Sequence, residues 1–136
     1  MSETEELLDA ACAAYQTRRF EEAEDLCRRV LAGEPHSPEA MHMLGVIADA
    51  TGRREAGIEL LQQAVALAPD YVEALTDLGH LLQEEGRHEE ALMALQRALR
   101  LDTSAVPALN SLGEVYLATG RPAQAATAFE QAIALA

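Results

Sequence analysis

The sequence predicts an all-α fold made of repeated helix pairs, and three observations lead to that prediction. Apolar residues recur at helical spacing, and no segment shows the alternation typical of a strand. The segments are separated by short glycine-led breaks. A pair of glycines also recurs, and each pair lies 34 residues from the next: Gly45 and Gly52, Gly79 and Gly86, and Gly113 and Gly120. A period of this length is typical of a stack of one supersecondary unit.

Each unit reads as helix, turn, helix. The third unit shows the pattern: Leu75, Leu78 and Leu82 are spaced as on one face of a helix. The break at 86–88 follows, and Ala91 then resumes the helical period. The register tiles the chain as four units, at roughly 4–37, 38–71, 72–105 and 106–136. Four units exceed the three or so that a stable stack requires.

Three of the glycines are expected inside helices rather than in turns. Gly45, Gly79 and Gly113 each follow a leucine in the middle of a predicted first helix. Glycine inside a helix costs about 1 kcal/mol relative to alanine. We therefore expect close approach of the paired helix, which a side chain at these positions would prevent.

Helix starts are indicated by capping patterns. A side-chain oxygen followed three residues later by glutamate is typical of a first turn, as is proline at the first helical position. The predicted starts are at Ser2 with Glu5, Ser37 with Pro38, and Asp70 with Glu73.

These residues resemble the tetratricopeptide repeat (TPR) family, whose unit reads W-x2-L-G-x2-Y, then A-x3-F, then P. The matching residues are Leu44-Gly45, Leu78-Gly79 and Leu112-Gly113, then Ala91 with Leu95 and Ala125 with Phe129, and finally Pro35 and Pro69. The chain departs from the motif at the tryptophan slot (Leu7, Met41, Leu75, Leu109), at Ala11 in place of glycine, and at Thr103 in place of proline. The resemblance implies a right-handed α-solenoid that works as a protein-protein interaction scaffold, with its first helices lining a concave groove.

Charge is the second informative feature. The formal net charge is −13, and the ten basic residues are all arginines. Six are expected in the turns: Arg18, Arg19, Arg53, Arg54, Arg87 and Arg121. The other four are expected late in the second helices: Arg28, Arg29, Arg97 and Arg100. None falls on a predicted first helix.

A helical wheel predicts which residues of the first helices face away from the core. Met41, Leu44 and Ala48 mark the core side of one helix, and the opposite side gives the stripe. The candidates for a peptide groove are Asp9, Cys12, Tyr15, Glu39, His42, Met43, Val46, Asp49, Glu73, Thr76, Asp77, His80, Gln83, Glu84, Asn110, Glu114 and Leu117. This acidic stripe favours a basic or neutral peptide or helix as partner. Alternatively, the carboxylates complement helix dipoles and keep the chain dissolved.

Several function classes are disfavoured. Nucleic-acid binding requires a basic surface, which is absent. No apolar run approaches the roughly 20 residues of a membrane helix. The cationic clamp by which some TPR domains hold chaperone C-termini is missing. The asparagine ladder of O-linked N-acetylglucosamine transferases is also missing, since its slot holds Asp9, Met43, Asp77 and Ser111, and Asn110 is one residue out of register.

No residue set predicts catalysis, a cofactor or a metal. The chain has no phosphate-binding loop and no nucleophile elbow, so we expect no enzyme activity. Cys12, His42 and His80 are possible metal ligands but lack a ligand spacing on one helix, so we expect no metal. His36 and His88 are expected in turns, and Cys27 in the core.

The last unit has no further helix to cover its apolar side, which predicts a truncated segment or self-association through the C-terminal helix. Two alternatives to the scaffold therefore stay open: the non-catalytic N-terminal arm of a larger bacterial transferase, of glycosyltransferase or sulfotransferase type, or an architectural self-assembling repeat protein. With no leader-like start and two cysteines, the expectation is a cytoplasmic protein, and arginine without lysine suggests a bacterial one.

Overall fold

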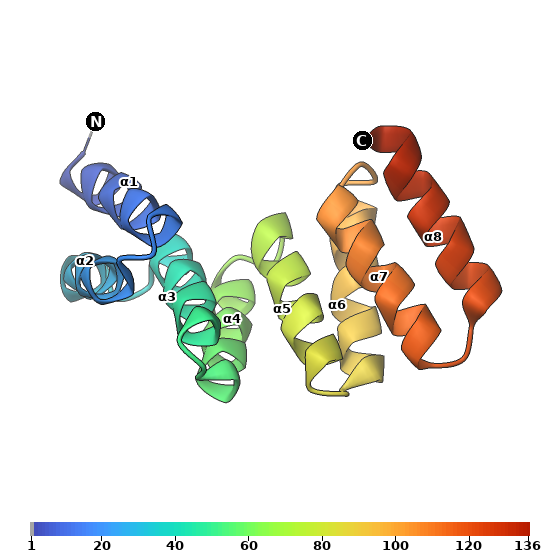
Figure 1. The fold of residues 1–136 in the computed structure, drawn as a ribbon. Helices are drawn as coiled ribbons and strands as arrows, with labels where there is room; N and C mark the ends of the chain where they lie inside the picture. Colours follow the sequence, from blue (N-terminus) through green and yellow to red (C-terminus); the bar gives the residue numbers. More distant parts are fainter. Residues whose placement is uncertain (1) are drawn as a thin grey trace. The chain divides into compact units, whose positions relative to one another are not determined.

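The computed structural model describes residues 2–136, and that part of the chain contains eight α-helices and no strand (Figure 1). The helices are α1 (Glu3–Gln16), α2 (Phe20–Gly33), α3 (Pro38–Ala50), α4 (Arg54–Leu67), α5 (Val72–Glu84), α6 (His88–Leu101), α7 (Val106–Ala118) and α8 (Pro122–Leu135). Each odd-numbered helix packs against the even-numbered helix that follows it. The predicted all-α class is confirmed.

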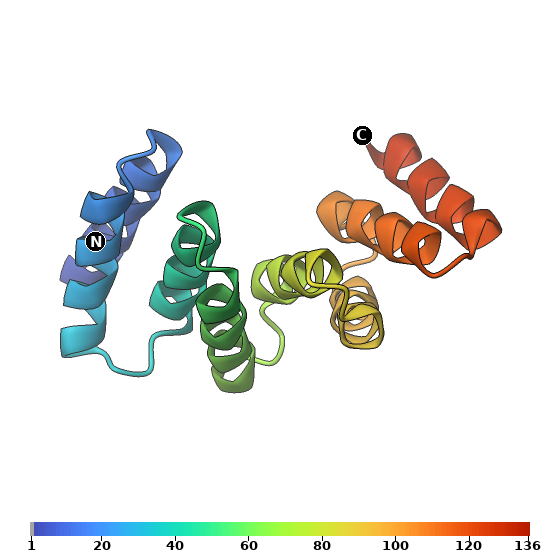
Figure 2. The ribbon, with the colours of Figure 1, turned by 60° about the horizontal axis from the view of Figure 1, so that its bottom comes forward.

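The chain divides into two compact units, Met1–Pro69 and Asp70–Ala136. In the first unit, α3 packs against both α1 and α2. In the second unit, α7 packs in the same way against α5 and α6, and Figures 1 and 2 both show α7 beside α8. Within each unit, therefore, the two odd-numbered helices are neighbours.

Small residues and leucines form the core of each unit. The first unit buries Ala11, Ala14, Ala23, Cys27, Leu44 and Ile47 in one cluster from α1, α2 and α3. In the second unit, Leu75, Leu78 and Leu82 of α5 and Leu95 of α6 are buried. The expected core residues Leu44 and Ala48 are buried, whereas Met41 is only half-buried.

Two of the three predicted caps are confirmed. Ser2 Oγ accepts a hydrogen bond from the Glu5 backbone N–H at 3.1 Å, and Ser37 Oγ accepts one from Ala40 at 3.2 Å. The predicted cap at Asp70 is wrong, because α5 starts one residue later than that pattern requires. Its N-cap is Tyr71, whose side chain makes no capping hydrogen bond.

The turn inside each helix pair closes with one hydrogen-bond pattern. At the end of α3, the Gly52 N–H donates to the Asp49 carbonyl at 3.1 Å, and the Arg53 N–H donates to the Ala48 carbonyl at 2.7 Å. This Schellman arrangement needs a left-handed residue, and Gly52 has φ of 82°. In the turn between α1 and α2, the left-handed position is taken by Arg18 instead of glycine, with φ of 62°. Left-handed backbone costs a non-glycine residue about 1–2 kcal/mol, so this turn is strained.

The glycines inside the odd-numbered helices lie where two helices come closest. A Cβ added to Gly79 would lie 2.5 Å from Leu95 Cγ, and one added to Gly45 would lie 2.9 Å from Leu61 Cγ. Such distances are well below van der Waals contact. The expected close approach of the paired helix is therefore confirmed.

We predict that Gly79→Ala destabilises the second unit by about 1–3 kcal/mol, because the added methyl forces Leu95 out of its site. Gly33→Ala is the matched control: Gly33 is also helical, and a Cβ there meets nothing within 4 Å. The control should stabilise slightly, since alanine is the better helix former. Urea unfolding followed by circular dichroism measures both, and equal midpoints for the two variants would contradict the packing argument.

Candidate functional site

The candidate site is the acidic stripe, defined as the seventeen groove candidates on α1, α3, α5 and α7. None of these four helices carries an arginine or a lysine. Carboxylates are present on all four helices: Glu3, Glu5, Glu6 and Asp9 on α1, Glu39 and Asp49 on α3, Glu73, Asp77 and Glu84 on α5, and Glu114 on α7. The sequence predicted that no arginine falls on the first helix of a pair, and the observed helix boundaries confirm this.

In the first unit the stripe residues lie on α1 and α3, which are in contact. Asp9 and Glu39 are exposed, and the half-buried members are Cys12, Tyr15, His42, Met43, Val46 and Asp49. The Tyr15 ring packs against Phe20 with centroids 5.7 Å apart, which fixes its position. Asp49 Oδ1 lies 3.6 Å from Arg54 Nε, so a cation from the start of α4 partly neutralises this end of the stripe.

In the second unit the stripe lies on α5 and α7, which are also in contact. Glu73, Glu84, Asn110, Glu114 and Leu117 are exposed, while Asp77, His80 and Gln83 are half-buried. His80 Nε2 lies 2.6 Å from Glu84 Oε1, one helical turn away. Thr76 is only 6% exposed and offers little surface to a ligand. The helical wheel predicted that Thr76 would be accessible, because a wheel describes one helix alone and does not include the neighbouring α7 that packs against α5.

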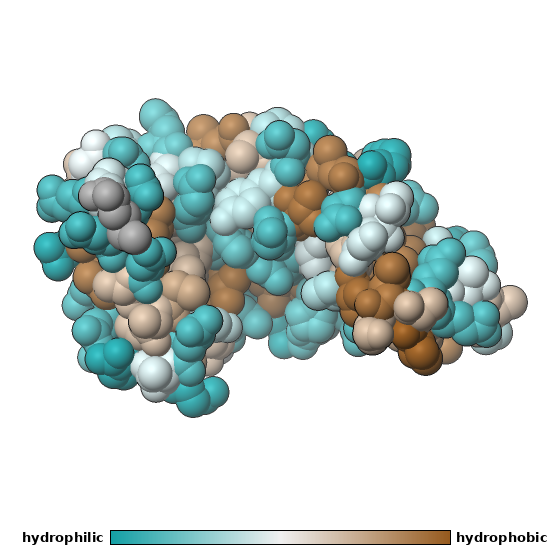
Figure 3. Space-filling view, turned by 90° about the horizontal axis from the view of Figure 1, so that it is seen from above, coloured by the Kyte–Doolittle hydropathy of each residue, from teal (hydrophilic) through white to brown (hydrophobic). Residues whose placement is uncertain are grey.

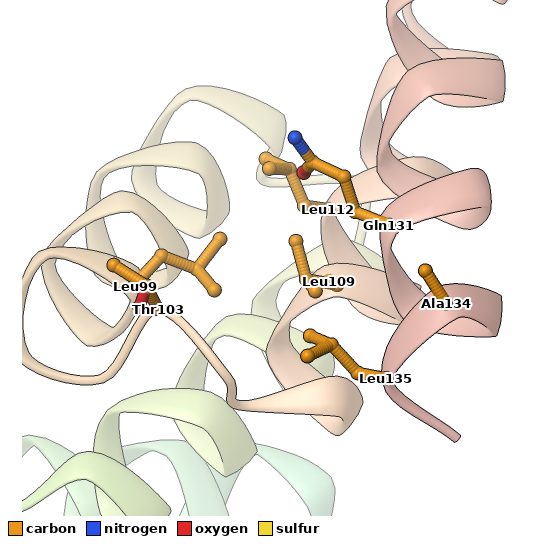
Figure 4. Close-up of a pocket in the computed structure, with 7 residues that line it drawn as sticks. All are labelled: Leu99, Thr103, Leu109, Leu112, Gln131, Ala134 and Leu135. Atoms are coloured by element: carbon orange, nitrogen blue, oxygen red, sulfur yellow. The ribbon is translucent and has the colours of Figure 1, made fainter.

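The structure also contains an apolar pocket that the sequence did not indicate. It has a volume of about 470 Å³ and is lined by Leu99, Thr103, Leu109, Leu112, Gln131, Ala134 and Leu135. Figure 4 shows Leu99 and Thr103 on one side, Gln131, Ala134 and Leu135 on the other, and Leu109 between them. Hydrophobic residues gather over these C-terminal helices in the space-filling view (Figure 3). No lining residue is charged, so the pocket suits an apolar side chain.

A second hollow, of about 440 Å³, lies on α5 and α6. We call it the α5–α6 groove. Its lining residues are Leu75, Met93, Ala94, Gln96, Arg97 and Arg100. The only sequence signal for it is the pair of arginines three residues apart on one face of the predicted helix.

The two cysteines lie in different environments. Cys27 is fully buried, and burial, with the nearby Glu24 carboxylate adding to it, raises the pKa of its thiol from 9.0 to about 12. Cys12 is half-buried. No group of three histidine, cysteine or acidic side chains within residues 2–136 could hold a metal ion. His88 was expected in a turn, but it is the first residue of α6.

Ion pairs at the turns hold several arginines in place. Glu24 Oε1 accepts from Arg28 at 2.6 Å and from Arg53 at 3.3 Å, which ties α2 to the turn between α3 and α4. Arg87 donates to both carboxylate oxygens of Glu90, and this hydrogen bonding lowers the pKa of that exposed carboxyl.

Family models confirm the resemblance seen in the sequence. Two models described as tetratricopeptide repeat match the chain, one over residues 14–78 and the other over residues 70–136. The chain belongs to the tetratricopeptide repeat family. The helix pairs packed one after another within each unit are those of a TPR α-solenoid.

Solved structures show the same fold. PilF of Pseudomonas aeruginosa has a TM-score of 0.91 and 26% identity, over 97% of this chain and 60% of that protein. A thermophilic TPR protein of Thermus thermophilus has a TM-score of 0.85 and 25% identity, over 97% of this chain and 74% of the other. An O-GlcNAc transferase of Thermobaculum terrenum has a TM-score of 0.79 and 30% identity, over 83% of this TPR chain but 22% of the enzyme.

A sequence search of curated proteins found no match. Across residues 2–136 of the TPR chain, every helix is too short or too polar to cross a bilayer.

We predict that the two thiols of the TPR chain react at different rates. An aromatic disulfide reagent near neutral pH should modify Cys12 in the native protein and Cys27 only after unfolding, because the buried thiol stays protonated. The Cys12→Ser variant isolates Cys27. Rapid modification of that variant without denaturant would contradict the buried site.

Cys27 also predicts a pH dependence of stability. Between pH 9 and about pH 12, the thiol ionises in the unfolded chain but stays protonated in the fold. The unfolded state then binds fewer protons, so stability falls as pH rises through this range. Cys27→Ala removes this effect, and its deficit in unfolding free energy relative to the parent should shrink above pH 9. A deficit that stays constant with pH would contradict the prediction.

Proposed function

We propose that the TPR chain is a non-catalytic interaction scaffold that binds a basic or neutral peptide or helix along the acidic stripe. One observation carries the proposal: α1, α3, α5 and α7 hold exposed carboxylates and no arginine or lysine, although the chain has ten arginines. A surface of one sign attracts ligands of the other sign and accelerates their encounter.

Apolar side chains along the stripe would supply contact area beside the charges. Leu117 is 56% exposed on α7, and Tyr15, Met43 and Val46 are half-buried on α1 and α3. Methionine adapts its shape to different partners, and tyrosine combines an apolar ring with a hydroxyl. A peptide with lysine or arginine beside occasional large apolar residues matches this mixture.

Dipole stabilisation explains only part of the stripe. Glu39 and Glu73 lie in the first turns of α3 and α5, where a carboxylate contributes about 0.3–1 kcal/mol. Asp77 and Glu114 lie beyond the first turn. A role in solubility would also not require all the arginines to be on other elements. These positions favour a ligand role.

The proposal includes the division into four repeats at 4–37, 38–71, 72–105 and 106–136, stacked as a right-handed solenoid. It also includes the cytoplasmic and bacterial setting expected from the composition. The observed helix pairs support the division, since one pair coincides with each of the four ranges apart from Glu3, the first residue of α1.

Self-association is a second candidate, favoured by the exposed apolar residues of α8. Ile133 is 74% exposed, and α8 carries a single charged residue, Glu130. Light scattering over a range of concentrations tests it. A mass that rises with concentration and returns to the monomer value in Ile133→Ser would support it, and a constant monomer would exclude it.

A role as the arm of a larger transferase is the third candidate, supported by the likeness to part of an O-GlcNAc transferase. The intact mass of the endogenous protein tests this candidate. A mass near 14.7 kDa would exclude a fused catalytic domain, and a much larger mass would support one.

We predict that a lysine-rich peptide binds at least about tenfold more tightly than a glutamate-rich peptide of equal length, and that added salt reduces the difference. Replacing two stripe carboxylates, in Glu73→Gln with Glu114→Gln, should weaken the lysine peptide about three- to tenfold. Fluorescence anisotropy provides the affinities.

The matched control is Glu89→Gln with Glu130→Gln. It makes the same change in charge at exposed residues, one in a first turn and one in mid-helix, on α6 and α8. The control should change affinity by less than about twofold, because screening confines the effect to nearby charges. Equal losses in both double variants would refute the assignment to the stripe.

A further inference from the structure

We propose that the α5–α6 groove is a second docking surface, and that it binds an acidic amphipathic peptide whose carboxylates flank a large apolar side chain. This proposal goes beyond the function proposed above, which concerns a basic ligand on the acidic stripe. The groove lies wholly within the second unit, and none of its lining residues belongs to the stripe.

The floor of the groove is apolar and its rim carries an exposed methionine. Leu75 and Ala94 are buried beneath it, whereas Met93 is 71% exposed. A volume of about 440 Å³ lies within the usual range for ligand sites and admits a large side chain. An exposed flexible thioether beside such a hollow can close over an apolar group that enters it.

Two arginines supply the charge. Arg97 and Arg100 are three residues apart and therefore neighbours on one face of α6. Neither makes an ion pair with a carboxylate of residues 2–136, although acidic residues outnumber basic ones by 23 to 10. Guanidinium groups bind carboxylates through two parallel hydrogen bonds, so an unpaired couple beside an apolar floor fits an acidic ligand.

The helix dipole explains only one member of the pair. Arg100 lies in the last turn of α6, where a cation complements the carbonyl end of the helix. Arg97 lies before that turn, and the dipole contribution falls off within one turn. The position of Arg97 over the groove therefore needs another reason, and a carboxylate ligand provides one.

The apolar pocket of α7 and α8 serves as an internal comparison. Leu109, Gln131 and Ala134 line it, each 34 residues beyond Leu75, Arg97 and Arg100. A hollow at this register therefore forms with or without arginine, and packing of the helices suffices to build it. Of the two helices compared, only α6 carries positive charge at this register, which is why we assign that charge to ligand binding.

The test uses a fluorescein-labelled helical peptide with glutamate pairs three residues apart around one leucine and one phenylalanine, and a charge-reversed copy with lysine for glutamate. The acidic peptide should bind, and Arg97→Gln with Arg100→Gln should weaken it by about tenfold or more. Amide chemical shifts should change at α5 and α6. Circular dichroism of every variant verifies that its fold is intact.

The control double variant is Arg29→Gln with Arg121→Gln. Both residues are exposed, neither pairs with a carboxylate in the described chain, and the loss of charge is identical. We expect less than about a twofold effect. For the apolar part, Met93→Ser should weaken the acidic peptide about threefold or more, whereas the equally exposed Ile133→Ser should not.

A gain-of-function variant provides a test that does not depend on a loss of peptide affinity. Gln131→Arg with Ala134→Arg gives the apolar pocket lined by Leu109 and Leu135 the charges of the α5–α6 groove, and the stoichiometry of the acidic peptide should rise from one to two. The proposal is overturned if the lysine copy displaces the acidic peptide from the same amides, or if both arginine double variants lose affinity equally. It is also overturned if the protein forms dimers and Arg97→Gln with Arg100→Gln abolishes them, since the occupant would then be a second copy.

The acidic and lysine-rich peptides are titrated separately, so each surface is judged alone. Failure of the lysine-rich peptide to bind would remove the stripe proposal and leave the α5–α6 groove intact. Failure of the acidic peptide would do the reverse.

Discussion

Close approach of the two helices in each pair is the constraint on which the rest of the structure depends. Gly79 lets Leu95 reach the backbone of α5, and Gly45 does the same for Leu61 of α4. Because a large residue of the even-numbered helix fills the space above each glycine, that side of the odd-numbered helix is closed to solvent. The opposite side is left for polar residues, and the acidic stripe lies there.

Hydrogen bonds within the turns explain the positions of two arginines. Arg53 Nε donates to Thr51 Oγ1 at 3.1 Å, and Arg19 repeats this bond with Thr17 at 2.9 Å. The threonine hydroxyls in turn donate to carbonyls at the helix ends. Arg19 and Arg53 are thus part of the turn structure, whereas the absence of arginine from the odd-numbered helices is not explained by these bonds. Arg97 lies within α6 and outside the turns, so these bonds do not explain its position.

The sequence predicted what depends on local pattern. Gly79 could be placed at a close approach because glycine inside a helix needs a reason, and Ser37 could be placed at a cap because its side chain acts within one turn. Features that depend on neighbouring helices were not predictable. Thr76 is buried through tertiary packing, and α5 starts after Tyr71 despite the better capping residue before it. The left-handed Arg18 was hidden because no glycine marks the position.

The two candidate surfaces of the second unit follow from one helical geometry. On α5, Glu73 and Leu75 are two residues apart and so point in nearly opposite directions, one to the stripe and the other to the α5–α6 groove. Packing fixes the shape of each surface, while residues such as Gln131 and Arg97 at the same register differ in charge without altering the hollow. Charge on a repeat scaffold can therefore vary from one repeat to the next while the hollow keeps a similar size. Two ligands of opposite charge could then bind one unit without competing for the same side chains.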